Sequence, residues 1–162
     1  MPSGKTHAAM TLSAVSGVIA PYLIVQLNGN PYFYIIGNLV GLLVTPDLDL
    51  NNDNYSHYII RKAFYPAYWI WRLFWKPYSL LISHRSPISH FPFVGTLFRI
   101  GYIFLLLNLF RWLFFLFGNI FNDTVSFVWF WNWSLVLGLC HVDALHYFAD
   151  ITIKSKEQFI GE

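Results

Sequence analysis

The feature that most constrains this chain is a long stretch without charge. No Asp, Glu, Lys or Arg occurs from Ala8 to Pro46. The polar sequence 28–31 divides this stretch into two apolar segments, which predicts a helical hairpin. The first segment, residues 8–27, matches the roughly 20 residues that a helix needs to cross a bilayer, and the second, residues 31–46, is shorter.

The composition agrees with a membrane environment. The 162 residues are 56% hydrophobic and 20% aromatic, and only 11% are charged, against about 25% in an ordinary soluble domain. These values, with a mean hydropathy of +0.48, exclude a disordered chain and argue against a soluble monomer. Five Lys and five Arg form no basic run, so we expect no nucleic-acid partner. The length fits one domain, residues 1–162, and Cys140 as the only cysteine can form no internal disulfide.

Two further apolar segments follow, at residues 91–117 and 125–149. Between the second and third segments, residues 51–90 mix basic with aromatic side chains, which is typical of a helix lying at the membrane surface. We therefore predict an all-α fold, an integral membrane bundle of about four transmembrane helices with an interfacial amphipathic segment between spans two and three. A connector packed on the bundle is the alternative for that segment, and a cleaved signal peptide is the alternative for the first span.

The basic residues predict the orientation. Lys5 precedes the first span, the segment 51–90 carries five basic residues, and Lys154 and Lys156 follow the fourth span, whereas both short hairpin loops carry none. Because basic residues favour the cytoplasmic side, we expect both termini in the cytoplasm.

A small-residue motif lies in the second span. Gly37 and Gly41 form a GxxxG pattern. The pattern is common and indicates close packing of two helices within one chain more often than dimerisation.

This topology brings polar residues from distant parts of the chain to one cytoplasmic layer. His7 lies at the start of span one, and the sequence from Thr45 to Asp49 closes span two. Pro46 helps to end the helix at Thr45. If the following residues are extended, Asp47 and Asp49 share one face and can bind one cation, and a solvated acidic turn is the alternative.

Two histidines precede the third span. His84 and His90 flank Pro87 on a predicted turn and could converge from its two sides, with lone surface histidines as the alternative. Arg85 beside them could clamp an anionic group or orient a carboxylate.

The end of span four carries a third polar group. At 100° per residue, Asp143, His146 and Asp150 lie within about 60° of one another. His146 and Asp150, four residues apart, can offer an imidazole and a carboxylate to one ion, and Asp143 could be a ligand or hold an imidazole. His141 lies on the opposite side, where we expect packing or a lipid contact.

Ionisable groups near a membrane are costly, so several that face one place predict a functional site. Histidines and carboxylates without thiolates suit zinc best, with manganese or iron as alternatives, and their number exceeds one tetrahedral shell, which makes one or two ions plausible. Two ions about 3.5 to 4 Å apart can activate water and stabilise the leaving oxygen of a phosphoester. Asp49 or Asp143 could then act as the base.

These motifs resemble a known family. They are the opening residues 1–7 ending in His7, the Pro46-Asp47-Leu48-Asp49 turn, the His84-Arg85-Ser86 and Ser89-His90 sequences, and His146 with Asp150. They resemble uncharacterised metal-binding membrane proteins allied to the YdjM-like membrane-bound metal-dependent hydrolases, and more distantly the zinc-dependent phospholipase C group. The resemblance implies a metal-ligand set comprising His7, Asp47, Asp49, His84, His90, His146 and Asp150.

The sequence therefore favours a membrane-embedded, metal-dependent hydrolase. Its expected substrate is a phosphoester of a lipid or amphiphile at the cytoplasmic membrane face, and the lipid bilayer is its expected partner. The alternative is a non-catalytic membrane protein that senses or buffers metal ions. An open metal position would distinguish the first from the second. A metal transporter ranks last, since the outer halves of the spans offer few polar residues.

Overall fold

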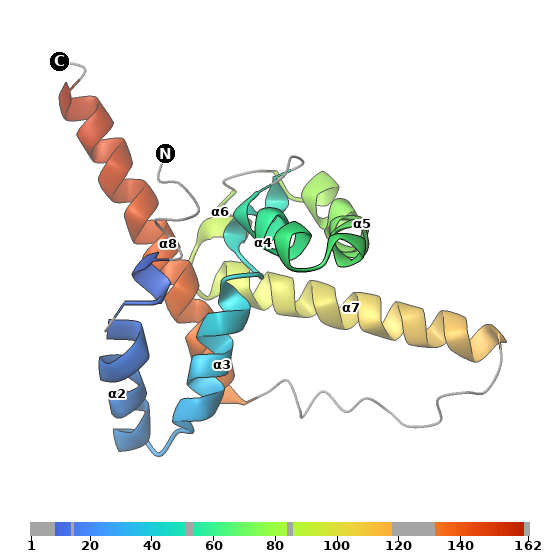
Figure 1. Ribbon diagram of the computed structural model, residues 1–162, viewed down its shortest axis with the longest axis horizontal. Coiled ribbons are helices and arrows are strands. Elements are labelled where there is room, and N and C mark those ends of the chain that lie inside the picture. Colours follow the sequence, from blue (N-terminus) through green and yellow to red (C-terminus); the bar gives the residue numbers. More distant parts are fainter. Residues whose placement is uncertain (1–8, 14, 51–53, 84–85, 118–131, 161–162) are drawn as a thin grey trace.

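A computed structural model describes residues 9–13, 15–50, 54–83, 86–117 and 132–160 of the chain (Figure 1). Every regular element within these residues is helical, which confirms the all-α prediction. The elements are the π-helix η1 (Val15–Ile19), α2 (Ala20–Gln26), α3 (Pro31–Gly41), the 3-10 helix η2 (Pro46–Asp49), α4 (Tyr55–Ala63), α5 (Tyr65–Leu81), α6 (Pro87–His90), α7 (Val94–Phe117) and α8 (Trp133–Ile160).

The hairpin predicted at the N-terminus is formed by α2 and α3. The turn between them contains Asn28 in the left-handed region, at φ 56°, a conformation that Asn tolerates better than most residues. Asn30 then caps α3, because its side-chain oxygen accepts hydrogen bonds from the backbone N–H groups of Tyr32 and Phe33 at 3.0 and 3.3 Å. Pro31 at the first helical position needs no hydrogen-bond partner for its nitrogen, which favours this start.

Helix α3 packs closely along α8 (Figure 1). The contact is built on glycines, since a Cβ on Gly37 would lie 2.2 Å from the carbonyl oxygen of Leu135, and one on Gly138 would lie 2.3 Å from that of Tyr34. Gly41 faces the side chain of Val142 in the same way. The GxxxG pattern therefore marks helix packing within the chain, as predicted.

The close approach of α3 and α8 predicts that a methyl group added at Gly37 lowers the stability of the fold. Gly37→Ala is expected to destabilise the fold by about 1–3 kcal/mol, because the added methyl meets a backbone carbonyl that only a shift of α8 can relieve. Gly101→Ala in α7 is the matched control, since nothing lies within 4 Å of a Cβ there, and it should be neutral or gain up to about 1 kcal/mol of helix propensity. Thermal unfolding of the two purified variants measures this difference. Equal shifts of the same sign would contradict the packing.

An aromatic cluster joins η2 to α5 and α7. Leu48 is completely buried against Trp75 and Tyr78 of α5, and Tyr102 of α7 stacks on Trp75 at a centroid distance of 5.4 Å. The Tyr102 hydroxyl also donates a hydrogen bond to the carbonyl oxygen of Phe74 at 2.5 Å. The cluster fixes η2 against α5 and α7.

The predicted spans correspond to helices of different lengths. Among the described residues, one helix segment, Val94–Leu113 of α7, is long and apolar enough to cross a membrane. In contrast, α3 has 11 residues and measures about 16 Å at a rise of about 1.5 Å per residue, roughly half of a bilayer core. Helix α2 is shorter still, and the first part of the predicted fourth span lies outside the described residues.

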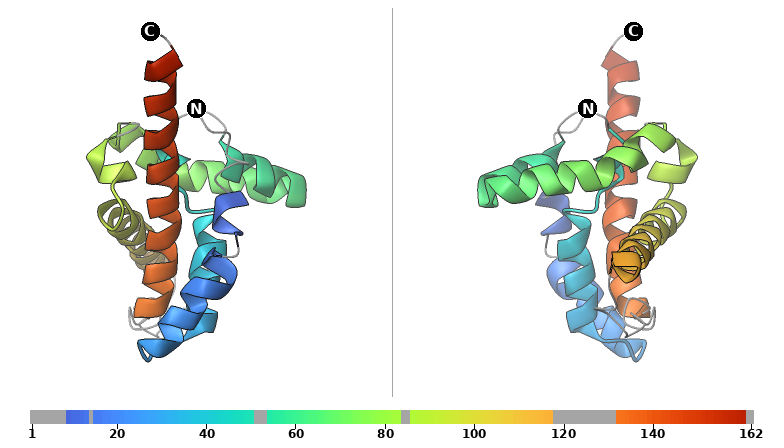
Figure 2. Two further views of the ribbon diagram at one scale, coloured as in Figure 1. Left: turned by 90° about the vertical axis from the view of Figure 1, so that its left-hand side faces the viewer. Right: turned by 90° about the vertical axis from the view of Figure 1, so that its right-hand side faces the viewer.

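The helices do not form one parallel bundle. Helix α7 contacts α8 near its N-terminal end and then diverges from α3 and α8 (Figure 1). Helix α5 runs across the direction of α8 (Figure 2). The residues between predicted spans two and three thus form a separate helical layer, in which α5 follows α4 almost directly.

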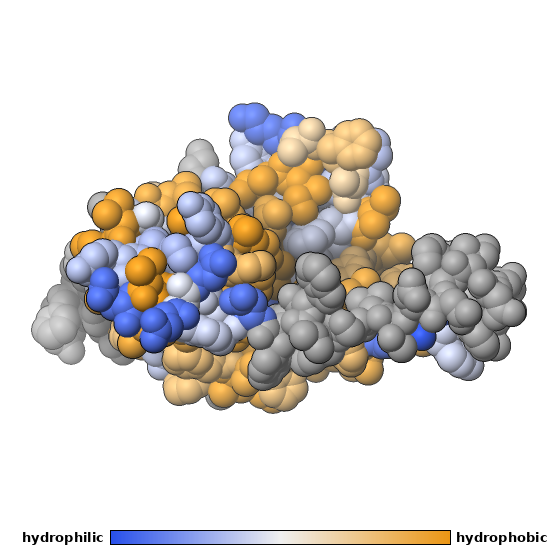
Figure 3. Space-filling view, turned by 90° about the horizontal axis from the view of Figure 1, so that it is seen from below, coloured by the Kyte–Doolittle hydropathy of each residue, from blue (hydrophilic) through white to orange (hydrophobic). Residues whose placement is uncertain are grey.

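Large apolar side chains are exposed over much of the described surface. On α5 they lie on the face opposite the aromatic cluster and include Trp69, Ile70, Leu73 and Leu80, each more than half exposed. Figure 3 shows apolar residues over much of the face at the α2–α3 turn, around a polar patch. Helix α5 is therefore apolar on two opposite faces, and the aromatic cluster covers only one of them.

Candidate metal site

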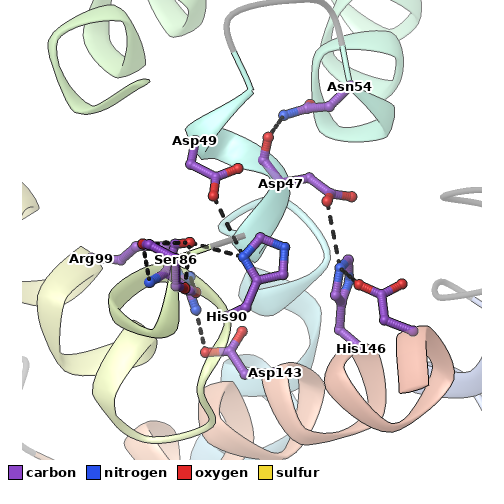
Figure 4. A network of polar contacts seen from close by, with 10 residues as sticks. Asp47, Asp49, Asn54, Ser86, His90, Arg99, Asp143 and His146 are labelled. Atoms are coloured by element: carbon purple, nitrogen blue, oxygen red, sulfur yellow. Dashed lines mark hydrogen bonds and ion pairs between the residues drawn. The ribbon is translucent and has the colours of Figure 1, made fainter. Parts of the chain in front are cut away.

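Three elements far apart in the sequence bring potential metal ligands together. Asp47 of η2, His90 of α6 and His146 of α8 each offer one ligand atom, and these atoms all lie within 4.8 Å of one another (Figure 4). The two imidazole rings have centroids 5.8 Å apart. The convergence predicted for the ends of spans two and four and the start of span three is thus present in the structure for these three residues.

The Asp47 turn differs from the extended conformation considered above. Residues 46–49 form the 3-10 helix η2, with the N–H of Leu48 donating to the carbonyl of Thr45 at 3.2 Å and that of Leu50 to the carbonyl of Asp47 at 3.0 Å. Because a 3-10 helix has three residues per turn, Asp47 and Asp49 point about 120° apart. Pro46 starts this turn after an extended Thr45, as the effect of proline on the residue before it predicts. The preceding helix α3 ends at Gly41 rather than at Thr45, and the predicted shared face of Asp47 and Asp49 is wrong.

Asp47 itself is fixed from α4. The Asn54 amide donates a hydrogen bond to the Asp47 carbonyl at 2.8 Å, and the Asn54 side-chain oxygen caps α4 by accepting from the N–H of His57 at 3.0 Å. One residue therefore ties the start of α4 to the turn that carries the carboxylate (Figure 4).

His90 is oriented by its neighbour in α6. The Ser89 hydroxyl lies 3.1 Å from the Ser86 carbonyl, to which it donates, and 2.8 Å from His90 Nδ1. A hydroxyl has one proton to donate, so with that proton directed at Ser86 the Ser89 oxygen accepts a hydrogen bond from an N–H at His90 Nδ1. The lone pair then lies on Nε2, the ring nitrogen on the side of Asp47 and His146 (Figure 4). A hydrogen-bonded second nitrogen is the usual arrangement for a metal-binding imidazole.

Asp49 lies beside this imidazole rather than within the three-residue group. Its Oδ2 is 3.5 Å from His90 Nδ1, and its side chain is fully buried. A carboxylate in this position orients the ring and increases its basicity toward a metal. The structure therefore favours a supporting contact for Asp49 over the ligand and base roles considered from the sequence.

The end of α8 agrees with the helical spacing. His146 Nε2 lies 3.5 Å from Asp47 Oδ1 and 3.6 Å from Asp150 Oδ2, so the residues four apart do face one point. His141 lies elsewhere, with its Nδ1 in contact with the Tyr34 hydroxyl of α3, as expected for a packing residue.

Asp143 has a different role from those considered. Its carboxylate is buried and accepts hydrogen bonds from the Arg99 guanidinium and the Thr96 hydroxyl, both on α7. Arg99 also donates to the carbonyl of Ser89 at 2.9 Å. Asp143 thus neither joins the three ligand residues nor contacts an imidazole directly. The sequence reasoning missed Thr96, Ser89 and Arg99, and an Arg in an apolar segment was the available signal.

Burial also affects a phenol near this pair. Desolvation raises the pKa of Tyr78, and the positive charge of Arg99 partly opposes this increase. The phenol therefore remains neutral at physiological pH.

Three of the predicted site residues cannot be placed. His7, His84 and Arg85 lie outside the described residues, so their distances to Asp47, His90 and His146 stay undetermined. The structure thus places four of the seven expected ligands in one region, namely Asp47, His90, His146 and Asp150, with Asp49 behind His90.

The geometry and chemistry of this group fit a divalent ion. Two ligand atoms on one tetrahedral zinc ion are about 3.4 Å apart, given metal–ligand distances of about 2.0 to 2.1 Å. The contacts of His146 with Asp47 and Asp150, at 3.5 and 3.6 Å, already have this spacing. The separations of the ligand atoms of His90 from those of Asp47 and His146 are at most 4.8 Å.

The fold and this site define the class: an all-helical protein with a His/Asp cluster suited to a metal ion. Residues 2–137 match the model of a family described as uncharacterized metal-binding protein (DUF2227), and the chain belongs to this family. No curated protein and no solved structure matches the chain. The expectation of an uncharacterised metal-binding family is thus confirmed.

Proposed function

We propose that this protein is a membrane-bound, metal-dependent hydrolase of phosphoesters, acting at the cytoplasmic face. The observation that carries the proposal is the half-open shape of the His/Asp site. The side chains of His90 and His146 are 10% and 5% exposed, whereas those of Asp47 and Asp150 are 25% and 24% exposed. Ligands buried on one side and accessible on the other leave room for water or substrate, as catalytic metal sites require.

The ligands and the supporting residues have different proposed roles. Asp47, His90 and His146 would hold the ion, with Asp150 as a further carboxylate ligand or as the acceptor of a proton from water. A bound divalent ion, with zinc as the best fit and manganese or iron as alternatives, would lower the pKa of water and polarise a phosphoryl oxygen. Asp49 keeps the His90 ring oriented. A second ion, and roles for His7, His84 and Arg85, belong to the same proposal, as does the alliance with YdjM-like hydrolases.

Three observations support membrane association. The chain has no charge from Ala8 to Pro46, α7 contains a segment able to span a bilayer with only 22% of its window buried, and α5 exposes a stripe of large apolar residues. On α5, Arg72 and Lys76 border this stripe, and no acidic residue occurs from Asn54 to Asn122. Such a surface suits the headgroup region of an anionic leaflet. We propose that α5 lies on that leaflet, within a protein of about four spans whose termini are cytoplasmic.

The test begins with the protein purified in detergent. Elemental mass spectrometry should find about one to two equivalents of zinc, manganese or iron per chain. Hydrolysis of a chromogenic phosphodiester and of a phospholipid in mixed micelles should then require the metal, stop with a chelator, and recover when the metal is returned. Metal without turnover on either substrate would replace the hydrolase with a sensing or buffering protein. No metal after reconstitution would remove the site.

Membrane association is tested separately. The full chain should remain in the membrane fraction after an alkaline carbonate wash, which releases proteins held only by charge. Release into the soluble fraction would contradict the proposed spans without affecting the metal measurement.

A further inference from the structure

A buried ion pair lies close to the site, and none of the proposed catalytic steps uses it. The side chains of Arg99 and Asp143 are each 2% exposed, and Arg99 Nη2 contacts Asp143 Oδ2. A buried pair of this kind is a poor source of stability, since apolar residues of similar volume are often equally stabilising. Its presence one helical turn before His146 therefore calls for another explanation.

The pair connects two of the elements that carry the ligands. Asp143 lies on α8, three residues before His146, and Arg99 on α7 reaches from Asp143 to the carbonyl of Ser89 on α6. Ser89 directly precedes His90, and its hydroxyl lies 2.8 Å from Nδ1 of that ring. Arg99 thus links the backbone next to one imidazole to the helix that carries the other.

The turn between α6 and α7 has a strained backbone, so contacts from neighbouring residues must hold it in place. Phe93 adopts φ 68°, a left-handed conformation that is strained for a bulky residue and persists only where the surroundings hold it. Gly95 provides the space, because a Cβ at this position would lie 2.3 Å from the Ser89 carbonyl oxygen and 3.4 Å from Arg99 Nη1. The close approach of α7 to α6 lets the guanidinium reach this carbonyl.

We infer that Arg99 and Asp143 are positioning residues of the metal site, which hold Ser89 and thereby set the distance and orientation of the His90 imidazole relative to His146. The inference rests on the proposed function for its effect on metal binding. The pair itself is nevertheless testable in the metal-free protein, because its contact with the Ser89 carbonyl does not involve the metal.

The main variant replaces both charges, Arg99→Met with Asp143→Leu, so that no buried charge is left unpaired. Secondary structure and the melting temperature of the metal-free protein should stay close to the wild type, because the two new side chains are apolar and have a similar volume to the pair they replace. Zinc affinity, measured by competition with a chromophoric chelator, should fall about 10- to 100-fold, the usual loss when a contact behind a ligand is removed. Tyr34→Phe, which removes a hydroxyl contact between α3 and α8 far from His90, is the control and should keep its affinity.

A second readout needs no metal. Modification of histidines by diethyl pyrocarbonate, followed residue by residue with mass spectrometry, should be several-fold faster at His90 in the double variant and unchanged at His141. If the double variant fails to fold, Gly95→Ala provides the same test, because its methyl displaces the Ser89 carbonyl without changing any charge. Gly101→Ala is its control.

The outcomes separate the two proposals. A folded variant with zinc affinity and His90 reactivity both within about twofold of the wild type would overturn the positioning role. A wild-type protein that binds no zinc would overturn the proposed function, and the His90 modification rates would still decide whether Arg99 and Asp143 position the ring.

Discussion

His146→Ala is expected to lower zinc affinity by more than about 100-fold, so that the protein loses its metal during purification. His146 contacts two of the other proposed ligands, since its Nε2 lies within 3.6 Å of carboxylate oxygens of both Asp47 and Asp150. Removing even a residue behind a ligand costs about 10- to 100-fold in affinity, and loss of a ligand atom costs more. Elemental analysis of the purified variant and a zinc competition titration measure the effect.

His141→Ala is the matched control for this prediction. It removes an imidazole from the same helix, five residues earlier, where the ring contacts Tyr34 rather than the site. Its metal content should equal that of the wild type. Equal losses in both variants would show that α8 presents a different face to η2 and α6. Full metal retention in His146→Ala would show that the ligands lie elsewhere.

The parts of the site that could be predicted from the sequence depend on local rules. The spacing of His146 and Asp150 gives one helix face, and Pro46 keeps Thr45 extended before the turn that carries Asp47. The GxxxG pattern of Gly37 and Gly41 predicts a close helix contact, which the structure contains. Each of these inferences needs only helical geometry or the restricted backbone of proline, and tertiary contacts did not override it.

The parts that could not be predicted depend on contacts between distant residues. Asp143 has the same helix face as His146, so spacing alone assigns it to the site. Its actual partner, Arg99, lies 44 positions away in the sequence, and no local pattern indicates that the two meet. The conformation of η2 was missed for a similar reason, because Leu48 is drawn into the aromatic cluster of α5 and turns the two flanking carboxylates apart.

Apolar length proved an imprecise guide to helix length. The uncharged stretch at the N-terminus suggested two spans, but the structure has short helices there, with a π-helix preceding α2 and a tight turn after α3. Hydropathy reports which residues avoid water. It does not report whether an apolar side chain is buried inside the protein or left on its surface, and Leu48 and Leu73, with exposures of 0% and 75%, illustrate the two cases.

Leu48→Ala is expected to destabilise the protein by about 2–5 kcal/mol, the usual cost of truncating a fully buried leucine. The side chain packs in one buried cluster with Trp75 and Tyr78, and these large, rigid rings leave little scope for collapse into the cavity. The same change should weaken zinc binding, because Leu48 anchors the turn that presents Asp47 to His146 and Asp49 to His90. Chemical unfolding in detergent and a zinc titration measure the two effects.

Leu73→Ala is the control, since it makes the same truncation on the outward face of α5, where the side chain is 75% exposed. In detergent it should change the free energy of unfolding by less than about 0.5 kcal/mol, as substitutions on a surface generally do. Loss of stability without loss of zinc affinity in Leu48→Ala would show that η2 keeps its conformation without this anchor. Loss of both, with Leu73→Ala unchanged, would show that the aromatic cluster supports the metal site through a single side chain.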